Sequence, residues 1–161
     1  MGQHDAARSV RDDGPACRLT ITIPADPTQI SVVVDRVCRE LEERQWRDEA
    51  LMAIELALTE AVANAIHHGC GGDVTRLVEC SVGCGERDEV MIVVRDPGSG
   101  FDPGAVPDPL DPSNAFKPSG RGIFLMQALM DQVLFVNGGR EVQMRKRKAL
   151  KRSSDDTPGP E

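Results

Sequence analysis

Residues 58–69 read LTEAVANAIHHG, an apolar helical stretch that carries two polar residues, Glu60 and Asn64. Positions four apart on a helix share one face, so a carboxylate and an amide oxygen can point at one small site. An amide oxygen is a hard neutral ligand that suits Mg2+, and a carboxylate one turn away can accept a proton from an attacking hydroxyl. A solvent-facing stripe of polar residues explains this stretch equally well when it is taken alone.

The composition limits the classes of protein to which the chain can belong. The chain has 161 residues, typical of one domain, and 40% of them are hydrophobic, which is enough for a core. A net charge of -7 and an aromatic content of 3% argue against nucleic-acid binding. No stretch approaches the roughly 20 apolar residues that span a membrane, and residues 1–16 contain no signal-peptide core. We therefore expect a cytoplasmic protein that binds neither nucleic acid nor membrane.

The cysteines argue against a framework of disulfide bonds, because their number is odd and their spacing is irregular. A zinc site would need additional donors, of which His67 and His68 are the obvious ones, and structural zinc sites normally use paired short spacings. Small core residues are the favoured interpretation, and a cysteine-based metal sensor is kept as an alternative. The five cysteines are Cys17, Cys38, Cys70, Cys80 and Cys84.

The hydrophobic periodicity predicts alternating groups of strands and helices around one core. Strands are expected at 17–24, 74–84 and 89–96 and in a hairpin at 133–146, with helices at 28–46, 48–68 and 120–132. This order predicts an α/β two-layer sandwich, in which helices cover one face of a mixed, mostly antiparallel sheet. We expect a disordered arm at 1–16, a folded domain at 17–147 and a disordered charged tail at 148–161.

A second motif follows the apolar strand MIVV, where Asp96 begins the sequence DPGSG. A carboxylate at a strand end can accept a hydrogen bond from an exocyclic amine such as that of adenine. Gly98 and Gly100 would let the backbone approach a flat base or adopt a positive φ. A plain turn is the alternative, since this sequence is also good turn chemistry.

A third motif, SGRGIF at residues 119–124, opens a later helix. The unpaired N–H groups of a helix start bind anions, and Gly120 and Gly122 would let a phosphate come close. Lys117 and Arg121 add positive charge on either side. The motif lacks the G-K-[ST] of a P-loop, and the proline-rich loop at 101–119 before it is long enough to close over a ligand as a lid.

Together these motifs give the sequence a resemblance to the GHKL ATPases, the group of gyrase, heat-shock chaperone and histidine-kinase ATP domains. The stretches TEAVANAIHHG, VRDPGSGFDP and SGRGIFLMQALMDQV closely resemble the N, G1 and G2 boxes of bacterial anti-sigma-factor serine kinases. The resemblance covers about residues 18–147 and implies the GHKL (Bergerat) ATPase fold.

The resemblance also implies a role for each matching residue on the base and metal side of an ATP site. Asn64 would hold Mg2+ that bridges the phosphates, and Glu60 would be the general base that activates a serine hydroxyl. Asp96 would bind the adenine amine, with Gly98 and Gly100 shaping the base pocket.

On the phosphate side, the resemblance implies contacts from the third motif and its flanks. Main-chain N–H groups at Gly120 and Gly122 would hold the phosphates, with Lys117, Arg121 and Ile123 completing this wall.

The implied function is that of an ATP-dependent serine kinase and anti-sigma factor. Such a protein phosphorylates a STAS-domain anti-sigma antagonist and sequesters a sigma factor, so that transcription is regulated by partner switching; a homodimer is also plausible. The alternative is a catalytically weak or inactive nucleotide-binding module of the same fold. It draws support from Pro118, which stands where many relatives carry an arginine able to reach the γ-phosphate.

Overall fold

The computed structural model describes residues 17–85, 88–108, 110–114 and 120–148. The expected N-terminal arm, nearly all of the expected tail, and Lys117 and Pro118 lie outside the described residues. The strands and helices follow one another in the order β1 (Cys17–Pro24), α1 (Ile30–Glu43), α2 (Asp48–Asn64), β2 (Leu77–Gly85), β3 (Glu89–Arg95), α3 (Arg121–Leu129), β4 (Gln132–Val136) and β5 (Glu141–Arg147).

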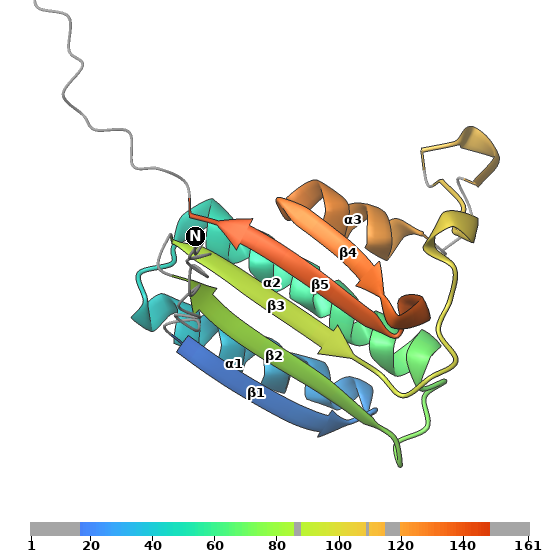
Figure 1. Ribbon diagram of the computed structural model, residues 1–161, viewed down its shortest axis with the longest axis horizontal. Coiled ribbons are helices and arrows are strands. Elements are labelled where there is room, and N and C mark those ends of the chain that lie inside the picture. The colour runs from blue at the N-terminus through green and yellow to red at the C-terminus, as the bar shows by residue number, and fades with distance from the viewer. Residues whose placement is uncertain (1–16, 86–87, 109, 115–119, 149–161) are drawn as a thin grey trace, which may run out of the picture.

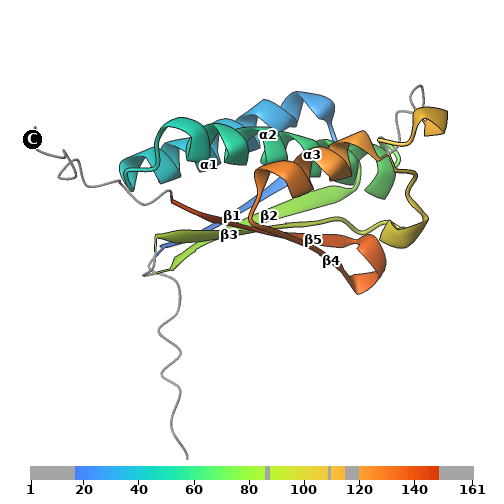
Figure 2. The same cartoon turned by 90° about the horizontal axis from the view of Figure 1, so that it is seen from above.

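The five strands form one sheet in the order β1-β2-β3-β5-β4, and the three helices all lie on one of its faces (Figures 1 and 2). This confirms the α/β two-layer sandwich with helices on one side. The expectation of a mixed sheet is corrected, because every neighbouring pair among these strands is antiparallel. Strands β3 and β4, joined through α3, do run in the same direction, but β5 lies between them.

The core lies between the sheet and the helices, as the alternation of the strand sequences requires. In β3, Val90, Ile92 and Val94 are buried under the helices, while the residues between them face the other side of the sheet. Helix α1 buries one stripe of apolar residues at helical spacing, namely Val33, Val34, Val37 and Leu41.

Helix α2 is the central helix and packs against both α1 and α3 (Figure 2). Ile54 and Leu58 are fully buried on its sheet-facing side. With the five-residue π-helical turn that follows, the segment Asp48–Gly69 is 22 residues long and is apolar enough to span a membrane by length and composition alone. The expectation that no stretch approaches this length is corrected, and in this fold the segment is the core helix.

In the described part of the chain, Cys70, Cys80 and Cys84 are buried in the core, and Cys84 is also disulfide-bonded. Cys70 and Cys80 are free and buried, and burial raises the pKa of the Cys80 thiol to about 12. Cys84 is disulfide-bonded, contrary to the expectation from spacing. No group of three metal-binding side chains occurs within the described ranges.

Candidate functional site

A cavity of about 420 Å³ lies where the C-terminal end of α2, the first turn of α3 and the segment after β3 meet. In Figure 1 this is the end of the domain at which α2 finishes and α3 starts. All three sequence motifs contribute to its wall. The polar and glycine residues that line it are Glu60, Asn64, His68, Gly69, Asp96, Gly100, Gly120, Arg121, Gly122 and Gly139. Ile123 also lines it, whereas Gly98 is buried just beneath.

The first turn of α3 packs directly onto the polar side of α2. A Cβ atom placed on Gly122 would lie 2.6 Å from Oε2 of Glu60 and 3.4 Å from Nδ2 of Asn64. Only a glycine allows this approach without displacing the carboxylate. The main chain at the start of α3 therefore lies against the carboxylate and the amide that the sequence places one turn apart.

The start of α3 is open to an anion. Its N-cap residue, Gly120, has a left-handed conformation with φ 93° and makes no side-chain capping hydrogen bond. A side chain at this position would also collide with the carbonyl oxygen of Pro107. Because Gly120 has no side chain with which to cap them, the first N–H groups of the helix can bind a phosphate, and the exposed Arg121 stands beside them.

At the other end of the cavity, Asp96 is held by the main chain directly after β3. Its Oδ1 accepts a hydrogen bond of 2.8 Å from the N–H of Gly98, and its own N–H donates to the carbonyl of Arg140 at 3.0 Å. Burial raises the pKa of the Asp96 carboxyl, and the Gly98 hydrogen bond works in the opposite direction. The carboxylate is thus fixed in orientation and partly withdrawn from water, which suits a single hydrogen bond to a base.

Gly69 completes this end, and sequence reasoning missed it as a site residue. Gly69 lies inside the π-helical turn Ala65–Gly69 that follows α2. A side chain on Gly69 would collide with the Asp96 carboxyl, and one on Gly98 would collide with the carbonyl of Gly69. The absence of a side chain at position 69 is therefore required by packing. His68, which the sequence indicates only as a possible zinc donor, lies on the cavity wall.

Two aromatic residues that the sequence did not single out form an apolar part of the wall. Phe101 and Phe135 meet edge to face, with ring centroids 5.3 Å apart. Phe101 is held in place by its N–H, which donates to the carbonyl of Gly138 at 2.9 Å. A signal for this contact was present in the Asn137-Gly138-Gly139 turn, which the sequence places only in a hairpin.

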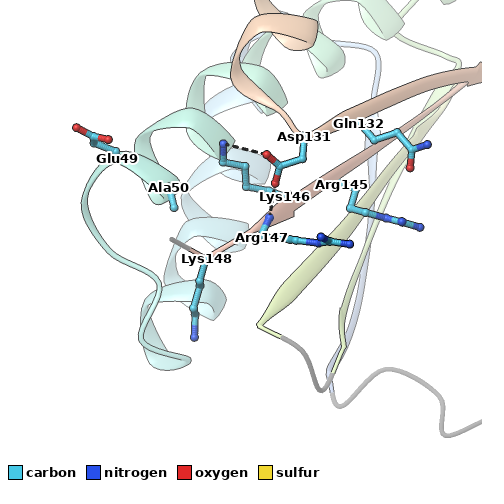
Figure 3. A pocket seen from close by; sticks show the side chains of 8 residues that line it. All are labelled: Glu49, Ala50, Asp131, Gln132, Arg145, Lys146, Arg147 and Lys148. Atoms are coloured by element: carbon cyan, nitrogen blue, oxygen red, sulfur yellow. Dashed lines mark hydrogen bonds and ion pairs between the residues drawn. The ribbon is translucent and has the colours of Figure 1, made fainter. Parts of the chain in front are cut away.

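A second cavity, of about 670 Å³, lies at the opposite end of α2 and contains none of the motif residues (Figure 3). It is lined by basic residues of β5 and by Lys148 directly after this strand, and two of these side chains bond to neighbouring segments. Lys146 Nζ donates to the carbonyl of Leu129 at 2.7 Å and lies 3.9 Å from Asp131, and Lys148 Nζ donates to the carbonyl of Arg44 at 2.7 Å. These contacts support a structural role for this cavity.

The donor set of the first cavity fits Mg2+ better than a metal held by protein alone. Asn64 supplies an amide oxygen beside Glu60, and the described residues contain no cluster of three His, Cys, Asp or Glu ligands. Mg2+ is commonly held by one or two protein oxygens, with water and substrate phosphates as its other ligands. A phosphate-bearing ligand at the start of α3 would have to supply the other ligands of such an ion.

Comparison with known proteins assigns this arrangement to a family. Residues 23–146 match the family model described as the histidine kinase-like ATPase domain, and the chain belongs to this family. The resemblance to the GHKL ATPases is confirmed.

Among the relatives are curated proteins named serine-protein kinase RsbW. The protein from Bacillus licheniformis is 28% identical over 83% of this chain and 88% of its own length. Those from Oceanobacillus iheyensis and Bacillus subtilis strain 168 are both 25% identical, over 74% and 86% of this chain and 78% and 91% of their own lengths. These names support the branch of anti-sigma-factor kinases within the family.

A solved structure supports the fold. The crystal structure of the RsbU and RsbW domains of a Mycobacterium tuberculosis protein matches with a TM-score of 0.60 and 19% identity. The match covers 83% of this chain and 32% of that chain, so this protein corresponds to about a third of the longer molecule.

Proposed function

We propose that this protein is an ATP-dependent serine kinase and anti-sigma factor that phosphorylates a STAS-domain antagonist and sequesters a sigma factor in the cytoplasm. The observation that carries the proposal is the meeting of three separated motifs in one cavity, with Glu60 against Gly122 at the open start of α3. The similarity to proteins named RsbW supports the choice of a protein serine as phosphate acceptor.

The nucleotide would lie along the cavity from Asp96 to the start of α3. The Asp96 carboxylate would accept a hydrogen bond from the adenine amine, with Gly100 lining the base pocket and Gly98 shaping it from beneath, where it packs against the carbonyl of Gly69. The N–H groups from Gly120 to Gly122 would hold the phosphates, while Arg121 offsets their charge; Lys117 and Ile123 would complete this wall. Asn64 would hold Mg2+, which would neutralise charge on the phosphates during transfer.

The transfer itself needs one proton acceptor, and Glu60 is placed for that role. The Oγ of the substrate serine forms a bond to the γ-phosphorus of ATP as the bond from that phosphorus to the bridging oxygen of ADP breaks. The hydroxyl proton passes to the Glu60 carboxylate, and ADP leaves with the electron pair of the broken bond. Most of the acceleration would come from positioning and charge neutralisation, as in other phosphoryl transfers.

The second candidate is a module that binds its partner with little or no phosphotransfer. It is favoured by Pro118, which stands where many related kinases carry an arginine. Arg121 could compensate as a cation, whereas Lys117 is a point charge without the planar fork of a guanidinium.

Radiolabelled ATP and the STAS-domain proteins of the same genome distinguish the two candidates. We expect label on one partner serine with the wild-type protein and its loss in Glu60→Ala, while the Kd for ATP is unchanged. Glu43→Ala is the matched control, because Glu43 is an exposed carboxylate at the end of α1 that does not line the cavity. Label transferred at the wild-type rate by Glu60→Ala would remove Glu60 from the mechanism, and ATP binding without any transfer by wild type would favour the second candidate.

A further inference from the structure

Three large apolar side chains are exposed on the outer surface of the helical layer, close in sequence to the residues that line the cavity. Met52 and Leu56 of α2 are 61% and 43% exposed, and Phe124 of α3 is 39% exposed. We call these three residues the apolar ridge. Exposed apolar groups that lie together on a surface commonly mark a site of protein interaction.

The position of Glu60 on α2 places the ridge beside it. Leu56 lies one helical turn before Glu60 and Met52 one turn before Leu56, so the three follow one side of the helix. The opposite side of α2 is fully buried at Ile54 and Leu58. Leu56 and Met52 therefore extend from the carboxylate along the solvent side of the helix.

Phe124 belongs to the same region because α3 starts against Glu60. Phe124 lies two residues after Gly122, and the main chain of Gly122 lies against the Glu60 carboxylate. Met126 is fully buried on the core side of α3, so Phe124, which is offset from it by about 200° on a helix, faces outward. The ridge thus flanks the solvent approach to Glu60 from both helices.

We propose that the apolar ridge is the docking surface for the serine-bearing protein substrate, an inference that rests on the proposed kinase function. A serine hydroxyl must come within hydrogen-bond distance of Glu60, about 3 Å, before its proton can be transferred. A folded substrate that reaches this point covers the residues one and two turns away on α2. A second copy of this chain seated on the ridge would instead cover the approach to Glu60.

The charges around the ridge define the complementary face of the partner. Glu49 and Glu55 are exposed on α2 on either side of Met52, and the whole chain carries a net charge of -7. A partner face with an apolar centre and basic residues at its rim would match both features. Charges at such a rim mainly set the association rate, whereas the buried apolar centre sets the affinity.

The test uses Leu56→Asp and Phe124→Asp, with Leu134→Asp as the matched control. Leu134 is 45% exposed but lies on β4, on the sheet face away from the helices. The probe is the STAS-domain protein of the same genome that accepts label from wild type. For each ridge variant we expect a rise of about tenfold or more in KM for this protein, with the Kd for ATP unchanged, because a charge replaces a buried apolar anchor. The control should match wild type.

The outcomes separate this inference from the kinase proposal. Ridge variants with a wild-type KM, or a control that loses as much as they do, would overturn the docking surface and leave the kinase intact. A wild-type dimer that Leu56→Asp converts to a monomer would assign the ridge to a second copy and also overturn it. If wild type binds the STAS protein without transferring phosphate, the kinase proposal fails. The docking surface is then tested by calorimetry: a raised Kd of the ridge variants for that protein supports it, and a wild-type Kd overturns it. If no STAS protein binds, both fail.

Discussion

Replacing Gly122 with alanine should slow phosphotransfer while leaving the free energy of unfolding nearly unchanged. Gly122 lies in α3 without a left-handed φ, so alanine fits the backbone there. Alanine is favoured over glycine within a helix by about 0.5–1 kcal/mol. The new Cβ would lie 2.6 Å from Oε2 of Glu60, and a contact this short forces one of the two groups to move.

The group that moves should be the Glu60 carboxylate, because this side chain is flexible and only partly buried. Its displacement to ordinary contact distance is about 1 Å, and a misplacement of this size can reduce a rate by about 100-fold. We therefore expect Gly122→Ala to keep its free energy of unfolding within about 1 kcal/mol of wild type. The rate of phosphate transfer to a STAS-domain serine should fall by about two orders of magnitude.

Single-turnover transfer and thermal unfolding, measured on the same preparations, test this expectation. Gly120→Ala is the comparison variant, because Gly120 has φ 93° and a Cβ there meets the carbonyl of Pro107. A non-glycine residue in this conformation costs about 1–2 kcal/mol, so this variant should lose stability as well as activity. Transfer at the wild-type rate by Gly122→Ala would show that the contact with α3 does not position Glu60, and a large fall in its Tm would refute the packing argument.

The remaining predictions concern the adenine end and the core. Gly69→Ala should weaken ATP binding, because its Cβ would collide with the Asp96 carboxyl; isothermal titration checks this, and wild-type affinity would contradict it. Acidification should weaken ATP binding by protonating Asp96, and it should do so at a higher pH than for a carboxyl with the ordinary pKa of 3.8, since burial raises this pKa. Asp96→Asn should lack that step when the two affinity profiles are compared, so identical profiles would refute the assignment. Ile92→Ala, at a fully buried position in β3, should lower the free energy of unfolding by about 2–5 kcal/mol in urea, whereas Val32→Ala at a 50% exposed position should change it little.

The sequence predicted the layers well, because each strand and helix buries an apolar face whose period is visible in the chain. It could not predict the order of the strands. The link from β3 through α3 to β4 suggests two parallel neighbours, and both strands do run the same way. The sheet is antiparallel because β5 lies between these two strands. The position of β5 depends on contacts between distant parts of the chain, and local sequence patterns do not reveal such contacts.

In the candidate site too, local sequence patterns revealed some residues, whereas the tertiary structure was needed to reveal others. Glu60, Asn64, Asp96 and Gly122 stood out because their residue types are unusual in an apolar helix, at a strand end and in a helix start. Gly69 did not, because a glycine after a helix already has a sufficient local explanation. Its actual constraint comes from the Asp96 carboxyl, which is 27 positions away in the chain and becomes a neighbour only when β3 ends beside α2. Gly69 lies in the π-helical turn that follows α2, so this constraint becomes visible only once the end of α2 and the end of β3 are packed together.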